Sequence, residues 1–115
     1  MPENKIEQVV YDVLADAKGQ DIQVLDVRKV TDITDFMVIA SGTSSRHVVS
    51  MAEKIQEKLR ELGRRALGTE GEKMGDWVLV DFGDVVVHIM RPQTRDFYNL
   101  EKLWSDGERA DVAGQ

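Results

Sequence analysis

With 115 residues, the chain has room for one domain and one modest core. It has no cysteine, which excludes disulfides, thiolate nucleophiles and cysteine-ligated metal centres. Its formal net charge of −6 disfavours direct nucleic-acid binding, but a local basic patch of Arg60, Arg64 and Arg65 is compatible with it. The charge suits a basic protein partner better, or it serves solubility alone.

The distribution of apolar residues gives no sign of a membrane. No apolar run approaches the roughly 20 residues of a membrane span. Met1–Gln8 is too polar and charged for a secretory signal. We therefore expect a cytoplasmic location and no contact with a membrane.

The first part of the chain predicts one helix and two strands. Apolar residues recur at helical spacing over about residues 4–18, which predicts an amphipathic helix ended by Gly19 as a left-handed cap. The β-branched run Ile22–Val27 predicts a short strand. Phe36–Ala40 is apolar without alternation, which is typical of a strand buried on both faces.

A second helix is predicted after the turn Ser41–Ser45. Its apolar stripe begins at Val48 and ends at Leu62, and we expect Gly63 to cap its end. The glycine-containing residues 64–76 then predict a loop, with a short strand near Ala66 and Leu67.

The clearest local pattern is a β-hairpin. Two β runs, Trp77–Phe82 and Val85–Met90, are joined by the two-residue turn Gly83–Asp84. The turn places Phe82 opposite Val85 and so fixes every other pair. One hairpin face is then wholly apolar and is expected in the core: Val78, Val80, Phe82, Val85, Val87 and Ile89. The other face is mixed and is expected to be partly exposed: Trp77, Leu79, Asp81, Val86, His88 and Met90.

The end of the chain predicts a short helix and a tail. Pro92 ends the second hairpin strand. Helical spacing of Phe97, Leu100, Leu103 and Trp104 predicts the helix, with Trp104 in the core. Residues 1–106 are expected to form a single domain and residues 107–115 a flexible tail. The element order predicts an α/β fold with a mixed β-sheet of about five strands and packed helices.

Three segments together resemble the Iojap/ribosomal silencing factor S family. They are Thr34–Val48 (TDFMVIASGTSSRHV), Trp77–His88 (WVLVDFGDVVVH) and Arg95–Trp104 (RDFYNLEKLW). They follow the order and spacing of that family, and the resemblance covers about residues 5–106. Each segment alone is a weak signal, whereas the ordered set is specific.

The resemblance implies a function that the periodicities do not show. Members of the family have a nucleotidyltransferase-like fold without its catalytic residues. They bind large-subunit ribosomal protein fourteen, block the joining of the subunits and lower translation when nutrients are scarce. They are often homodimers when free. By this resemblance the chain is a ribosome-binding translational repressor and not an enzyme.

The turn at Gly42 has two interpretations. A strand, a glycine turn and a helix N-terminus can hold a triphosphate, so a nucleotidyltransferase-like enzyme or nucleotide-binding protein is the alternative. That enzyme would need paired carboxylates for magnesium, and Asp81 and Asp84 have the wrong spacing. In the structural interpretation, Gly42 makes the turn and Thr43 or Ser44 caps the second helix. We expect the structural role, with no catalytic residue and no cofactor.

The two histidines are candidate metal ligands or catalytic bases. His88 is expected to lie diagonally across the hairpin from Asp81, but these two residues have no dependable third ligand, so no metal is expected. His47 begins the second helix and is expected to be solvated. Neither histidine is placed to act as a base for a serine nucleophile.

The mixed hairpin face is the predicted partner-binding site. Trp77 and Leu79 are expected to be apolar anchors, while Asp81 and Asp84 meet Lys or Arg side chains of the partner. Packing of Trp77 beneath a helix is the competing interpretation. The complete predicted set is Trp77, Leu79, Asp81, Asp84, His88 and Met90.

Overall fold

A computed structural model describes residues 5–104 and 107–115 of the chain. The helices are α1 (Ile6–Asp16), α2 (Ser45–Glu61), α3 (Pro92–Tyr98) and α4 (Leu100–Leu103). The strands are β1 (Gln20–Asp26), β2 (Phe36–Ser41), β3 (Gly68–Glu70), β4 (Trp77–Asp81), β5 (Val85–Met90) and β6 (Glu108–Arg109). No helix within the described ranges is long and apolar enough to cross a membrane.

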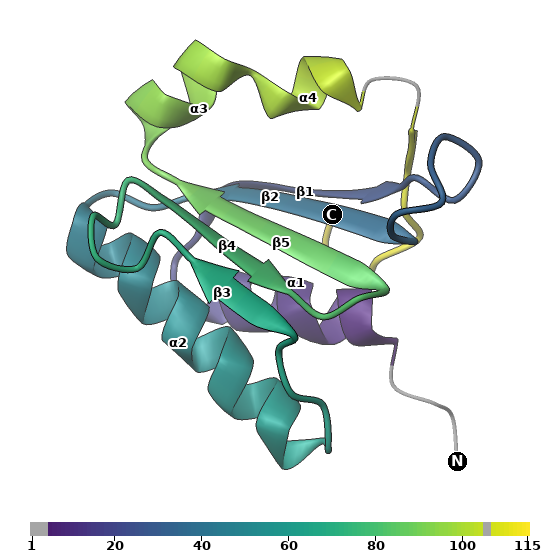
Figure 1. Ribbon diagram of the computed structural model, residues 1–115, viewed down its shortest axis with the longest axis horizontal. Coiled ribbons are helices and arrows are strands. Elements are labelled where there is room, and N and C mark those ends of the chain that lie inside the picture. The colour runs from purple at the N-terminus through teal and green to yellow at the C-terminus, as the bar shows by residue number, and fades with distance from the viewer. Residues whose placement is uncertain (1–4, 105–106) are drawn as a thin grey trace.

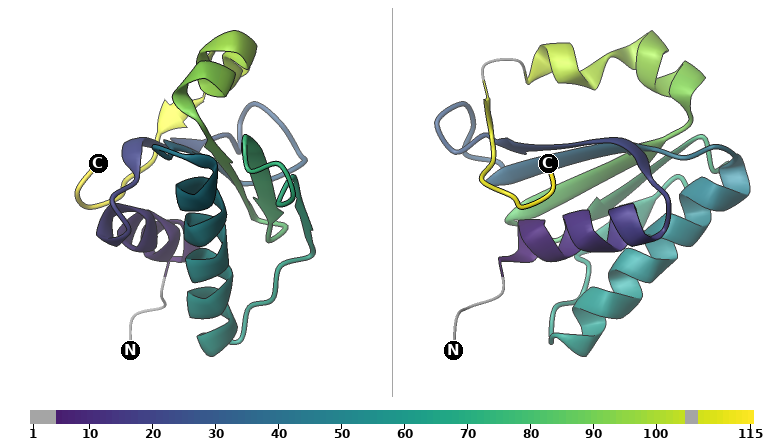
Figure 2. Two further views of the ribbon diagram at one scale, coloured as in Figure 1. Left: turned by 90° about the vertical axis from the view of Figure 1, so that its left-hand side faces the viewer. Right: turned by 180° about the vertical axis from the view of Figure 1, so that it is seen from behind.

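The strands form one open mixed sheet with helices on both faces. Its order is β3-β4-β5-β2-β1-β6, and β2 pairs with β5 in parallel while the other neighbouring strands are antiparallel. Figures 1 and 2 show α1 and α2 against one face and α3 and α4 over the other. This arrangement confirms the predicted α/β class and adds a strand to the expected five.

Each face of the sheet has its own apolar core. The larger core lies under α1 and α2 and includes the predicted hairpin face, from Val78 to Ile89. The smaller core contains Val27, Met37, Ile39, Val86, Met90 and Leu100. Because both faces are covered, the central strand β5 is buried along its whole length and β2 from Met37 onward. This explains the apolar run without alternation at Phe36–Ala40.

The hairpin has the register that its turn predicts. Trp77 pairs with Met90 and Val80 with Val87, and the Phe82 N–H donates to the Val85 carbonyl at 2.9 Å. Gly83 has a φ of 91°, a conformation that glycine adopts at little cost.

The two long helices are also confirmed, with one correction at an end. Gly63 has a φ of 82°, and the Arg64 N–H bonds back to the Leu59 carbonyl, as expected for a left-handed cap. At the end of α1, however, Lys18 and not Gly19 is left-handed, with a φ of 68°. Gly19 is needed for a different reason, because a Cβ there would lie 2.9 Å from the Leu14 carbonyl oxygen.

The short strand expected near Ala66 and Leu67 lies slightly later, at β3. Leu67 already donates its N–H to the Asp81 carbonyl at 2.7 Å, so the pairing with β4 begins one residue before the strand. β3 forms one outer edge of the sheet.

Residues 107–115 do not form the expected flexible tail. Glu108 and Arg109 pair with β1, and Ala110 and Val112 are buried in the larger core. Side-chain bonds secure the rest, since Gln8 both accepts from the Ala113 N–H and donates to its carbonyl. The prediction was wrong because the contacts that hold this polar segment come from distant parts of the chain. Residues 105 and 106, which were included in the expected domain, lie outside the described residues.

The expected C-terminal helix is two short helices with a break. Asn99 has a φ of 49° and separates α3 from α4. The break turns Phe97 and Leu103 outward, with exposed fractions of 81% and 71%. Leu100 remains buried and Trp104 packs against the smaller core, so only part of the predicted apolar stripe faces inward.

Gly42→Ala should lower the free energy of unfolding by about 1–3 kcal/mol, because overpacking strains a tight core. The new Cβ would lie 2.7 Å from Val48 Cγ2 and 3.1 Å from the Val48 nitrogen. Urea denaturation followed by circular dichroism measures the change. Gly68→Ala is the matched control, because nothing lies within 4 Å of its Cβ position. Equal stability of the two variants would contradict close packing at Gly42.

Candidate partner-binding surface

The mixed face of the hairpin is only partly accessible. Trp77 and Leu79 are half-buried, and Asp81 and Asp84 also keep part of their surface in solvent. Met90 is fully buried and His88 is 7% exposed. Met90 belongs to the smaller core together with Leu100 of α4, and α3 and α4 lie over this face of the sheet. The partial exposure that the sequence predicts for Met90 and His88 is therefore wrong.

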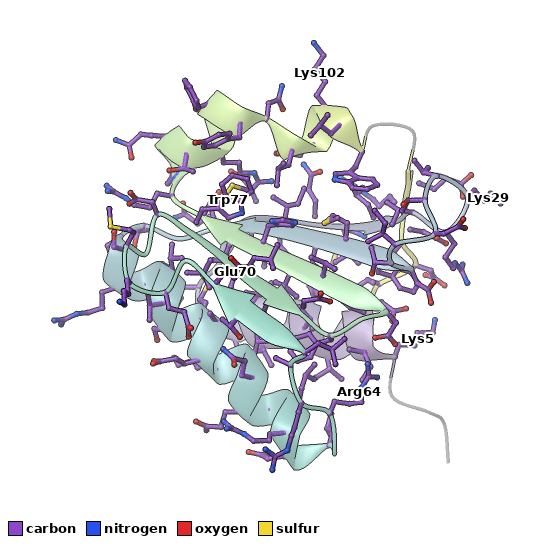
Figure 3. The ribbon with its side chains drawn as sticks, viewed as in Figure 1. Lys5, Lys29, Arg64, Glu70, Trp77 and Lys102 are labelled. Carbon is purple, nitrogen blue, oxygen red and sulfur yellow. The ribbon has the colours of Figure 1, made fainter. Side chains whose placement is uncertain are left out.

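Trp77 lies where the hairpin meets α3. Its indole Nε1–H donates to Nδ1 of His88 at 2.9 Å. Its ring centroid is 4.8 Å from that of Tyr98, with the planes tilted by 48°. Figure 3 shows Trp77 between the sheet and α3. One side of the Trp77 ring therefore packs against Tyr98 of α3, as the competing interpretation predicts, and part of its surface is accessible.

Two exposed aromatic side chains extend this surface. Phe97 is 81% exposed and Tyr98 is 52% exposed, and their rings meet edge to face at 5.0 Å. We call Trp77, Phe97 and Tyr98 the aromatic cluster. Sequence reasoning missed Phe97 and Tyr98 as surface residues because it assigned Phe97 to a buried helical stripe. Their adjacency was the available signal, since two consecutive helical residues cannot both face a single core.

A buried arginine holds α3 in this position. Arg95 is 6% exposed, and it donates from Nε to Glu101 Oε2 at 2.8 Å and from Nη1 to Ser41 Oγ at 2.9 Å. A charge that is removed from water needs such partners, so the three side chains act together. They join α3, α4 and the end of β2, and they fix the helix that carries Phe97 and Tyr98.

The two predicted acidic contacts have partners inside the chain. Asp81 accepts a hydrogen bond from the Gly83 N–H at 2.8 Å, which secures the hairpin turn. Asp84 forms an ion pair with Arg64 at 2.6 Å, and Arg64 also donates to the Phe82 carbonyl. Within the described ranges, no three His, Cys, Asp or Glu side chains are placed to hold a metal ion.

The groups around Gly42 serve the protein's own structure. Val48 and Met51 pack where a side chain of residue 42 would lie, and Gly42 donates its N–H to the Met90 carbonyl. Ser44 caps α2 by accepting from the His47 N–H at 3.1 Å, which confirms the structural interpretation of the turn.

His47 is not the solvated residue expected from the sequence. Its Nδ1 accepts from the Thr43 N–H at 2.9 Å, and its Nε2 lies 2.7 Å from the Ala17 carbonyl oxygen. These contacts assign the proton to Nε2. His47 therefore ties the end of α1 to the start of α2, and it occupies a backbone N–H that an anion in this turn would use.

His88 is held in its neutral form. Burial lowers the pKa of His88 from 6.5 to about 4. The neutral ring can accept the indole hydrogen bond of Trp77, because its Nδ1 then carries no proton. A buried histidine thus orients the half-exposed tryptophan above it.

The fold and this surface define an α/β domain with exposed aromatic side chains beside its central hairpin. A family model described as "Ribosomal silencing factor during starvation" matches residues 2–115. The chain therefore belongs to the family of ribosomal silencing factors.

Individual relatives agree with this assignment. The chain is 45% identical over 109 residues to a protein named ribosomal silencing factor RsfS from Chromobacterium violaceum, covering 95% of this chain and 88% of the relative. A mouse protein named "Mitochondrial assembly of ribosomal large subunit protein 1" is 36% identical over 114 residues, covering 93% of this chain and 50% of the relative. A crystal structure of a Chromobacterium violaceum protein superposes with a TM-score of 0.87 at 43% identity, covering 100% of this chain and 95% of that one.

The pKa of His88 predicts how stability depends on pH. The folded protein disfavours the charged ring, so the unfolded chain binds the proton first as the pH falls. The stabilising contribution of neutral His88 should therefore be fully present above about pH 6.5. As the pH falls toward 4, the free energy of unfolding should decrease by at most about 1.4 kcal/mol per pH unit. His88→Gln should remove this contribution, so the stability difference between the two proteins should shrink over that range. Urea denaturation at several pH values measures it, and a constant difference would contradict a neutral buried His88.

Proposed function

We propose that the chain binds the large ribosomal subunit through large-subunit protein fourteen and prevents the small subunit from joining. Translation is lowered as a result when nutrients are limiting. The mechanism is steric, because the bound domain occupies space that the small subunit needs. It requires no cofactor and no catalysed reaction, and it takes place in the cytoplasm.

The exposed aromatic cluster is the observation that carries this proposal. A side chain as large as Phe97 is costly to leave in water, and aromatic residues are frequent anchors of protein interfaces. The cluster is also preorganised, because Trp77 is bonded to His88 and α3 is held by Arg95. A rigid anchor loses little conformational entropy when it binds, so more of its contact energy contributes to affinity.

The remaining accessible residues of the predicted site lie along the hairpin, between Trp77 and the turn. Leu79 adds apolar surface beside Trp77, and Asp81 and Asp84 contribute negative charge toward the turn. These two carboxylates attract a basic partner over a distance, while each keeps its own internal contact. His88 and Met90 support the surface from beneath. A basic ribosomal protein is the partner that this arrangement favours.

The name of the mouse relative supports the choice of subunit, since that protein is named for assembly of the large ribosomal subunit. We also propose that the free chain forms a homodimer. Exposed Phe97 and Leu103 offer apolar surface for self-association. Light scattering of the free chain tests this point separately, and a monomeric mass would reject it.

Phe97→Ala should weaken binding to the large subunit by at least 2 kcal/mol, or about 30-fold, while the fold stays intact. Co-sedimentation of the purified chain with isolated large and small subunits measures the binding. Ile33→Ala is the matched control, because Ile33 is 79% exposed and lies between β1 and β2, away from the aromatic cluster. It should bind as the unchanged chain does.

Light scattering from mixed subunits then tests the mechanism. The unchanged chain should reduce subunit joining in proportion to the large subunits that it occupies, and Phe97→Ala should not. Binding to neither subunit, or binding without an effect on joining, would refute the proposal.

A further inference from the structure

A small basic cleft lies between the last turns of α2 and the edge strand β3. The cleft has a volume of about 210 Å³. Its lining residues are Gln56, Arg60, Arg65, Ala66 and Thr69, and none of them is acidic. Two of the five carry a positive charge, although the whole chain has a net charge of −6.

The charges of Arg60 and Arg65 are not neutralised by nearby acids. Both side chains are exposed, and neither forms an ion pair or side-chain hydrogen bond among residues 5–104 and 107–115. Arg64, between them in the chain, is paired with Asp84. Of the three arginines noted in the sequence, Arg64 therefore has a structural role. Arg60 and Arg65 can bind a group from outside the chain.

Two of the three acidic residues of α2, Glu57 and Glu61, lie on another side of the helix. Glu57 and Glu61 line the groove between α1 and α2, and Glu61 is paired there with Lys58 at 3.8 Å. The cleft beside β3 contains Arg60 from the same helix but no carboxylate. Arg60 is therefore turned away from Glu57 and Glu61, which share their groove with Lys54 and Lys58.

The neutral residues of the cleft are held in place. Gln56 donates from Nε2 to the Ala52 carbonyl at 3.2 Å and accepts from the Thr69 hydroxyl at 3.3 Å. Gln56 and Thr69 therefore form a fixed polar floor between two arginines that can move. Guanidinium groups match the geometry of phosphate oxygens and form paired hydrogen bonds with them.

We propose that this cleft binds phosphate groups of an RNA backbone when the chain is on the ribosome. The inference rests on the proposed function, and it adds ribosomal RNA as a second partner beside the protein partner. Two phosphate contacts bind RNA only weakly by themselves, which agrees with the expectation of little direct nucleic-acid binding. They can still add affinity to an interface that a protein partner already forms.

The position of the cleft allows both contacts at once. Figure 3 places Arg64 and Trp77 at opposite ends of the β4–β5 hairpin. A strand of this length spans about 17 Å. The cleft lies on the α2 side of the sheet and the aromatic cluster on the α3 side, so a ribosomal surface would reach both around the β3 edge. Arg64, next to Arg65 in the chain, connects this end of the molecule to the hairpin turn through its ion pair with Asp84.

The salt dependence of binding to the large subunit tests the inference. Each arginine–phosphate contact contributes roughly 0.7–0.9 to the slope of log affinity against log salt concentration. Arg60→Gln with Arg65→Gln should therefore reduce the slope by about 1.4–1.8 and weaken binding roughly tenfold at low salt. Lys54→Gln with Lys58→Gln is the matched control, because it removes the same charge from the α1–α2 groove. Equal slopes for the two double variants would overturn the inference.

A second measurement keeps the inference separate from the proposed function. An RNA of about a dozen nucleotides is titrated into the isotope-labelled chain at low salt and followed by NMR, with a glutamate peptide of equal charge in parallel. The resonances of Gln56, Arg60, Arg65 and Thr69 should shift with RNA and much less with the peptide. Shifts elsewhere, no shifts, or equal shifts with the peptide would overturn the RNA contact even if the subunit binds. The expected shifts without subunit binding would instead reject the proposed function alone.

Discussion

The turn at Gly83–Asp84 sets the register of β4 against β5, and a slip of one residue would exchange the two faces of the hairpin. In the observed register, the apolar face enters the larger core and Trp77 comes to lie beside His88 and the helix above it. Asp81 and Arg64 secure the turn from both sides. The acids that suggested a partner contact are thus also the groups that keep the hairpin in register.

The second face of the sheet determines what a partner can reach. Two short helices cover its middle, and their position depends on one buried arginine that bonds to Ser41 and Glu101. Helices of this length have little stability of their own, so they need this anchor and the apolar contacts of Leu100. Once held in this way, α3 exposes the rings of Phe97 and Tyr98 to solvent in a fixed orientation. The candidate surface therefore depends on α3 and α4 as much as on the strands of the hairpin.

Local patterns in the sequence predicted the parts of the fold that depend on neighbouring residues. The hairpin, the two long helices and the buried strand Phe36–Ala40 were found because period and turn chemistry act over a few residues. Parts that depend on distant contacts were missed. Ser41 lies far from Arg95 in sequence, and the last residues gain their partners from α1 and β1. For the same reason Met90 and His88 were expected at the surface, since nothing near them in sequence predicts a covering helix.

The parallel pair β2–β5 affects how the chain acquires this structure. α2, β3 and β4 all lie between these two central strands in the chain. Closing so long a segment costs entropy before any hydrogen bond of the pair forms. During synthesis, β2 therefore lacks one neighbour until Met90 has emerged, and its apolar side chains remain open to other chains. The fold should complete late and in one step, so truncation before the hairpin leaves an aggregation-prone fragment and not a smaller domain.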